Sequence, residues 1–175
     1  MRRLILMRHA KAEASSPGMA DRARVLTARG VKDAGLMGAY MASHALTPDR
    51  ALISPAARTQ QTWKLTAPSL KPPPPALAAD ALYDAMPDAI VDLIKAAPAT
   101  AQTLFVLGHN PGVHDAAMIL VASGDIDTRE RLREGLPTSG LIVIDFAFDD
   151  WSKLRPQSGR LERFVSPKWL EAATN

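Results

Sequence analysis

The chain of 175 residues suffices for one domain with a single core, and 47% of its residues are hydrophobic. It contains no cysteine, which excludes disulfides, thiolate metal sites and a cysteine nucleophile, and favours a reducing, cytoplasmic compartment. The net charge of +3 is mild, the basic residues are scattered, and no apolar run approaches the roughly 18 residues of a membrane helix, so we expect one domain over residues 1–175 that binds neither nucleic acid nor membrane.

The first part of the chain alternates short apolar runs with helical patterns. Arg3–Met7 predicts a buried strand, because four consecutive apolar residues suit a strand that is covered on both faces. Thr27 is the predicted N-cap of a helix that ends near His44 and carries apolar residues at helical spacing. A second short strand at 51–53 precedes a helix that we expect Ser54 to cap.

The middle of the chain continues this alternation after a run of prolines. Pro72–Pro75 cannot be helical and predicts an extended connector. A helix begins at Pro87, a strand occupies 103–107, and the apolar stripe from Val113 to Val121 predicts a further helix. The segment 124–137 is charged and predicts an irregular loop.

The last two apolar runs, 141–144 and 161–165, are predicted strands on either side of a turn at 156–159. Because strand, loop and helix recur three times, the sequence predicts an α/β fold. We expect a three-layer α/β/α sandwich whose central sheet is mostly parallel, with one antiparallel edge strand.

Cationic and imidazole side chains follow three of the predicted strands. The first strand leads directly into Arg8 and His9, the second leads to Arg58, and the strand at 103–107 leads to His109. Any one of these alone is an ordinary strand end. In an open α/β sheet, however, ligands bind outside the carboxyl ends of the strands, so the sequence predicts that these four side chains converge on one crevice.

This set of side chains suits a phosphoryl group. Guanidinium groups offer forked donors to phosphoryl oxygens, and a neutral imidazole is a nucleophile at neutral pH. A second imidazole adds a charged donor once it is protonated. A metal site is disfavoured because His109 and His114 lie five residues apart across a Pro-Gly pair, whereas helical metal ligands are three or four apart. We therefore expect neither a metal nor an organic cofactor.

The order of these motifs resembles the histidine phosphatase superfamily, also called the phosphoglycerate mutase-like family, and within it the small bacterial phosphohistidine phosphatases of the SixA type. The resemblance runs from Arg3 to about Pro167. It rests on three superfamily motifs and on one segment typical of the branch, which are Leu6–Ala12, Ile53–Thr62, Val106–Gly112 and Arg24–Gly30.

The resemblance implies that His9 is the nucleophile that becomes phosphorylated, while Arg8, Arg58 and His109 hold the phosphoryl group. Arg24 and Asn110 are expected to contribute to substrate binding.

One departure from the family pattern concerns the backbone after the nucleophile. Ala10 stands where most of the superfamily has glycine. Since the SixA-type branch tolerates alanine there, we expect ordinary backbone angles at this position.

The general acid is less clearly marked. Asp84, in the segment Leu82-Tyr83-Asp84-Ala85, is the candidate, although an aspartate is shorter than the usual glutamate and fits a loop or cap role equally well. Asp88 is a weaker alternative because it suits the N-terminus of the helix that begins at Pro87.

The resemblance implies a phosphatase that hydrolyses phosphohistidine, or a similarly labile phosphate, through a covalent phosphohistidine intermediate. Its partner would be a phosphorylated protein, such as a histidine-phosphotransfer domain, or a small phosphorylated metabolite. Two alternatives stay open: a broad small-molecule phosphomonoesterase or phosphoglycerate mutase-like enzyme, and a non-catalytic phosphate-binding or scaffold protein. The absence of a long capping insertion predicts an open pocket, which favours a protein-borne phosphate.

Overall fold

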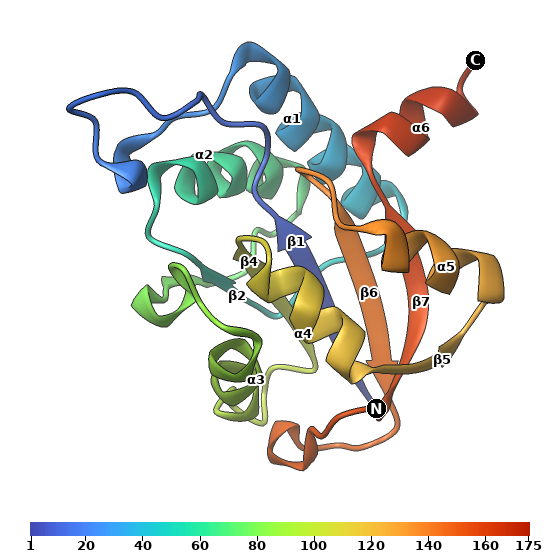
Figure 1. Cartoon of the computed structure of the whole chain (residues 1–175). Helices are drawn as coiled ribbons and strands as arrows, with labels where there is room; N and C mark the ends of the chain where they lie inside the picture. The colour runs from blue at the N-terminus through green and yellow to red at the C-terminus, as the bar shows by residue number, and fades with distance from the viewer.

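Seven strands form one sheet, and six α-helices cover its faces, in a computed structural model that describes all 175 residues (Figure 1). The strands are β1 (Arg2–Arg8), β2 (Arg50–Ile53), β3 (Ala76–Ala78), β4 (Thr103–Gly108), β5 (Val121–Gly124), β6 (Leu141–Phe146) and β7 (Gly159–Val165). The helices are α1 (Ala28–Ser43), α2 (Ala57–Thr66), α3 (Pro87–Lys95), α4 (Gly112–Leu120), α5 (Ile126–Glu134) and α6 (Pro167–Ala173).

The sheet has the order β3-β2-β4-β1-β6-β7-β5. The first four strands in this order are parallel to one another, β5 is parallel to β7, and β6 runs antiparallel to both of its neighbours. The predicted three-layer α/β fold with a mostly parallel sheet is confirmed. The antiparallel strand lies inside the sheet and not at its edge, because β7 and the short β5 extend the sheet beyond β6.

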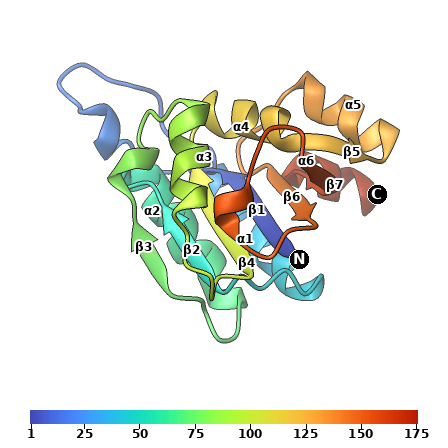
Figure 2. The same ribbon diagram turned by 90° about the horizontal axis from the view of Figure 1, so that it is seen from below.

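The two faces of β1 explain its uninterrupted apolar run. Leu4 and Leu6 belong to the core beneath α3, α4 and α5, whereas Ile5 and Met7 belong to the core beneath α1, α2 and α6 (Figure 2). Successive side chains of a strand point to opposite faces, so a strand buried on both sides is apolar at every position. The run therefore fixes β1 at the centre of the sheet.

The starts of two helices were predicted from their cap residues. Thr27 caps α1 as predicted, since its side chain accepts a hydrogen bond from the Gly30 amide. The start of α2 differs from the prediction. α2 begins at Ala57 with Ala56 as its cap residue, and Ser54 does not cap it. The Ser54 hydroxyl binds the His109 imidazole instead. Serine is typical of helix caps, but Ser54 directly follows β2 and positions the His109 imidazole instead of capping α2.

The segment 124–137 contains α5 and is not irregular, which corrects the prediction. Asp125 caps this helix and accepts a hydrogen bond from the Thr128 amide. Leu132 is the only buried residue of α5, so the helix shows no apolar stripe in the sequence. The edge strand β5 consists of Val121–Gly124. The predicted helix had included Val121, because this residue continues the apolar stripe of α4.

No helix of the structure combines the length and the apolar character needed to cross a bilayer.

Candidate active site

The carboxyl ends of β1, β2 and β4 lie side by side, because these three strands are neighbours and parallel. The loops that follow them line a cavity of about 470 Å³. All seven predicted site residues line this cavity, namely Arg8, His9, Arg24, Arg58, Asp84, His109 and Asn110. Five further lining residues were not predicted as site residues, namely Lys11, Ala12, Asp21, Tyr83 and Thr138.

His9 directly follows β1, and only 8% of its surface is exposed. Its Nδ1 lies 2.7 Å from the carbonyl oxygen of Ala10. Since a carbonyl oxygen only accepts hydrogen bonds, Nδ1 carries the proton and Nε2 keeps its lone pair. Burial lowers the pKa of His9 to about 3, so the imidazole is neutral at pH 7. Ala10 is not among the residues with positive φ, which confirms the expectation of ordinary backbone angles there.

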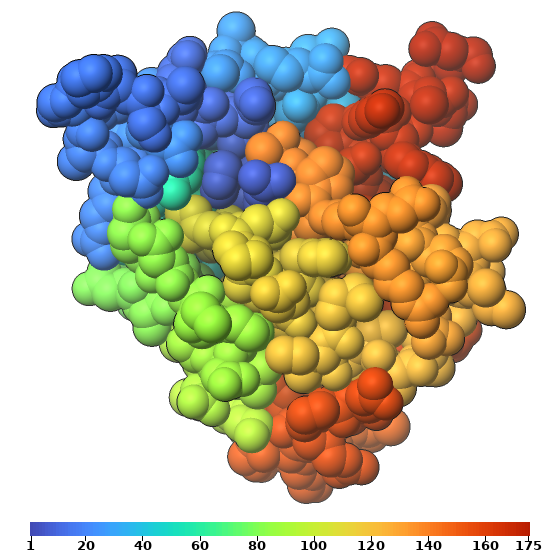
Figure 3. Space-filling model, in the orientation of Figure 1, coloured from blue at the N-terminus to red at the C-terminus, as the bar shows by residue number.

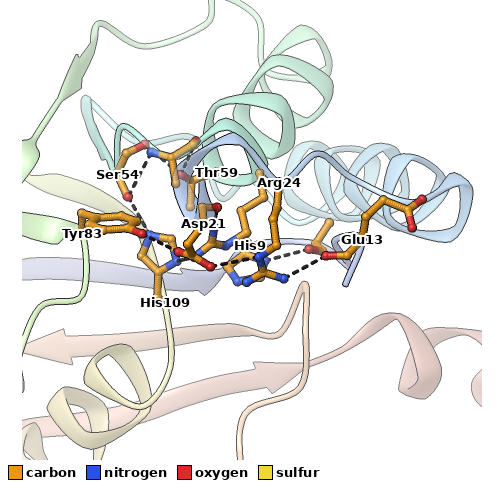
Figure 4. Close-up of polar contacts among 11 residues, drawn as sticks. His9, Glu13, Asp21, Arg24, Ser54, Thr59, Tyr83 and His109 are labelled. Carbon is orange, nitrogen blue, oxygen red and sulfur yellow. Dashed lines mark hydrogen bonds and ion pairs between the residues drawn. The ribbon is translucent and has the colours of Figure 1, made fainter. Parts of the chain in front are cut away.

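His109 follows β4 and is held between Ser54 and Arg58. An Nη2 donor of Arg58 lies 3.3 Å from its Nδ1, so Nδ1 accepts and the Nε2 proton is donated to the Ser54 hydroxyl at 2.6 Å (Figure 4). Burial, followed by the positive charge of Arg58, lowers the pKa of His109 to about 4. The His9 and His109 ring centroids lie 5.3 Å apart, so two neutral imidazoles share the cavity.

The loop between α5 and β6 orients two of the predicted residues. The carbonyl oxygen of Leu136 accepts one hydrogen bond from Arg8 Nη1 at 3.0 Å and another from Asn110 Nδ2 at 2.8 Å. Both side chains are thereby fixed at the cavity wall. Burial lowers the pKa of Arg8, but a guanidinium remains charged at neutral pH.

Asp21 is the centre of a hydrogen-bond cluster that the sequence did not predict. It lies in a short 3-10 helix, Asp21–Ala23, and its backbone oxygen and Oδ2 accept from Arg58 at 2.9 and 3.1 Å. Arg24 donates to Oδ1 at 3.0 Å and the Tyr83 hydroxyl donates to Oδ2, so Figure 4 shows Asp21 between Tyr83 and Arg24. These hydrogen bonds, that of Tyr83 foremost, lower the pKa of Asp21 to about 2. The ionised carboxylate of Asp21 therefore forms an ion pair with the Arg58 guanidinium.

Asp84 is exposed at the cavity wall, with a φ of 48°. Its segment approaches α4 at Gly112, where a Cβ atom would lie 2.1 Å from the Ala85 carbonyl oxygen. A glycine at this position therefore permits the segment carrying Tyr83 and Asp84 to reach the cavity. Asp88 lies in the first turn of α3 and does not line the cavity.

His114 also lies outside the cavity, on α4, where its Nε2 contacts the Leu132 carbonyl oxygen at 2.7 Å. No three His, Asp or Glu side chains of the structure are grouped closely enough to hold a metal ion. The arrangement offers a neutral imidazole nucleophile beside two guanidinium groups, which is suited to binding and transferring a phosphoryl group.

The α/β sandwich and the cationic, histidine-bearing cavity at its strand ends define a phosphatase of the phosphoglycerate mutase-like class. The family model of the histidine phosphatase superfamily (branch 1) matches residues 4–82. An uncharacterized protein of Mycobacterium tuberculosis is 34% identical over 164 residues, which cover 93% of this chain and 100% of that protein. The chain belongs to the histidine phosphatase superfamily.

Two solved structures are similar to the chain over nearly its whole length. A candidate phosphohistidine phosphatase SixA from Agrobacterium tumefaciens is 31% identical, with a TM-score of 0.78 over 95% of this chain and 98% of that chain. A second, from Nakamurella multipartitia, is 28% identical, with a TM-score of 0.77 over 95% and 96% of the two chains. These similarities identify the chain as a phosphatase and leave its substrate to be proposed.

Proposed function

We propose that the chain hydrolyses phosphohistidine on a phosphorylated protein, through a covalent intermediate on His9. The observation that carries this proposal is the neutral His9 imidazole, which keeps the lone pair of Nε2 free beside Arg8, Arg58 and His109 in one cavity. The similarity to two candidate phosphohistidine phosphatases supports the choice of substrate.

In the first step, His9 Nε2 attacks phosphorus in line and forms a P–N bond. The P–N bond to the substrate imidazole breaks, its electron pair stays on that imidazole nitrogen, and the nitrogen takes a proton from Asp84 or from water. The positive charge that develops on the His9 ring is stabilised because Nδ1–H already donates to the Ala10 carbonyl oxygen. In the second step, water attacks phosphorus, the bond to Nε2 breaks, and inorganic phosphate leaves with the oxygen of that water.

Arg8 and Arg58 would bind the equatorial oxygens of the phosphoryl group, where transition-state charge develops. His109 would protonate at Nδ1 when a phosphoryl dianion enters, because a nearby negative charge raises an imidazole pKa. Arg24 and Asn110 would contact the bound group from the cavity wall.

A substrate with a labile P–N bond is best matched to Asp84 as the general acid. Asp84 is exposed and receives no hydrogen bond that would fix its position, so it is a weak candidate for protonating an alkoxide. An imidazole leaves from phosphorus more readily than an alcohol does. The cavity is lined by the loops at the strand ends, and no inserted domain covers it, because every helix and strand belongs to the one α/β sandwich. This suits a phosphate presented by a protein surface, such as a histidine-phosphotransfer domain.

The test is the hydrolysis of four substrates by the purified chain with chelator present: a phosphohistidine protein, a phosphoserine peptide, a sugar phosphate and 3-phosphoglycerate. We expect turnover of the first to exceed that of the others. The His9→Ala variant should be inactive, and Arg58→Ala or His109→Ala should lose at least about a hundredfold in rate. His44→Ala, an exposed residue at the end of α1, is the matched control.

Three outcomes would contradict the proposal. Wild-type rates in His9→Ala would refute the covalent mechanism. Preferred turnover of the sugar phosphate or 3-phosphoglycerate would instead identify a small-molecule phosphatase, and tight phosphate binding without hydrolysis of any substrate would identify a binding protein.

A further inference from the structure

The catalytic cavity is the first of three adjoining cavities. It shares Lys11 and Thr138 with a second cavity of about 450 Å³. The second shares Pro137, Ser166 and Lys168 with a third of about 400 Å³. We call the second and third cavities together the basic groove. Figure 3 shows the segments that form it meeting on one side of the molecule, the N-terminal part in blue, residues near 135 in orange and α6 in red.

The basic groove carries positive charge that the protein does not neutralise. Lys11, Arg131 and Lys168 line it, and none of the three has a carboxylate oxygen within 4.0 Å. Arg29, which also lines it, is matched by Asp33 at 3.0 Å. Glu134 at the far end is the remaining acidic residue in the lining, so the groove keeps a net positive charge.

An aromatic residue marks the far end of the groove. Trp169 on α6 is 51% exposed, and the Arg131 guanidinium lies 3.4 Å from the centroid of its ring. The Nε and Nη1 atoms of Arg131 are buried and have no hydrogen-bond partner. Tryptophan and arginine are among the residues most enriched at the energetic centres of protein interfaces.

We infer that the basic groove binds the polypeptide of the phosphoprotein substrate, and that it selects a segment with acidic side chains. The groove begins at the cavity where the phosphorylated residue would dock, so a chain that enters there continues along Lys11 and Lys168 toward Trp169. The exposed, unpaired Lys11 and Lys168 complement carboxylates of that segment. This inference rests on the proposed function only for the identity of the phosphorylated residue.

The kinetic test compares Lys168→Glu with Lys95→Glu, an exposed lysine on α3 that lies outside the groove. Each enzyme is assayed on free phosphohistidine and on a phosphohistidine protein with acidic residues beside the phosphorylated one. We expect Lys168→Glu to raise the KM for the protein about fivefold more than the KM for free phosphohistidine, with kcat retained, because an attraction becomes a repulsion. Equal changes for both substrates, or equal changes in both variants, would overturn the inference.

A binding test decides the inference even if the wild-type chain hydrolyses neither substrate, which would refute only the proposed function. A ten-residue peptide of alternating Glu and Gly should reduce acrylamide quenching of Trp169, the only tryptophan that is more than half exposed. A Lys–Gly peptide of the same length should leave the quenching unchanged, and in Lys168→Glu the protection by the Glu–Gly peptide should weaken.

Two results would overturn the inference. The first is equal protection by both peptides, or no protection by either. The second is a dimer that is lost in Trp169→Ala, which would assign the groove to a second copy of the chain.

Discussion

Lowering the pH from 7 to 5 should destabilise the fold through His9 and His109. Their pKa values are about 3 and 4 in the folded protein and about 6.5 in the unfolded chain, because burial disfavours the charged imidazole. Below pH 6.5 the unfolded chain therefore binds protons that the folded chain does not. The stability that depends on the neutral rings is complete above pH 6.5 and is lost as the pH falls toward 4 and then 3.

The expected loss is large relative to the stability of a domain. At pH 5 each imidazole of the unfolded chain is almost fully protonated and each folded one is still mostly neutral, which corresponds to about 2 kcal/mol per histidine, or about 4 kcal/mol for the pair. The free energy of unfolding of a typical domain is about 5–15 kcal/mol. Asp21 does not contribute in this window, because its pKa of about 2 lies below the ordinary aspartate value and its contribution is lost only below about pH 4.

Urea unfolding at pH 7, 6 and 5, followed by tryptophan fluorescence in a buffer without phosphate, measures this loss. The His9→Gln variant should show about half of the pH dependence, and His44→Gln, changed at an exposed site, should show all of it. A free energy of unfolding that is constant from pH 7 to 5 would refute the reasoning. The same slope in His9→Gln as in the wild type would assign the effect to other groups.

Three further predictions concern the surroundings of the nucleophile. If Asp84 is the general acid, Asp84→Asn should slow an alkyl phosphate at least tenfold more than phosphohistidine, and equal effects in steady-state assays would assign the acid to water or to another carboxylate. Asp21→Asn should tighten the binding of inorganic phosphate about fivefold in calorimetry, because it removes from beside Arg58 a negative charge that repels phosphate, whereas weaker binding would show that Asp21 aligns the guanidinium. Gly112→Ala should cost about 1–3 kcal/mol and lower kcat, since its Cβ would lie 2.1 Å from the Ala85 carbonyl oxygen; unchanged urea unfolding would contradict this close approach.

The sequence predicted those elements whose burial leaves a pattern. The run Leu4–Met7 is apolar at every position because β1 is buried on both faces. The residue that follows such a strand lies at the carboxyl end of the parallel strands, where ligands bind. That logic located His9 and His109 directly after their strands, and it located Arg58 in the segment that follows the second strand. β3 is a strand of three exposed residues, and α5 buries only Leu132, so neither carries a hydrophobic period from which it could be predicted.

Asp21 was missed for a different reason, which lies in tertiary contacts. It is 37 residues from Arg58 and 62 from Tyr83, and no strand precedes it, so nothing local marks it as part of the site. Tyr83, by contrast, stands next to Asp84 in the segment that the resemblance had already selected. A search for hydrogen-bond acceptors in the polar loop between Ala12 and Arg24 would have found Asp21 as one of two carboxylates, together with Glu13.

The role of Asp21 follows from the charges that line the cavity. Two buried imidazoles are neutral there, and the one guanidinium that is almost fully buried, Arg58, is paired with an ionised carboxylate. A phosphoryl dianion that enters brings the charge that Asp21 now supplies to Arg58, and it favours a proton on His109. Substrate binding then replaces an internal ion pair rather than filling a site of unmatched cations. This explains how Arg58 can be 3% exposed without the cost of an unpaired buried charge.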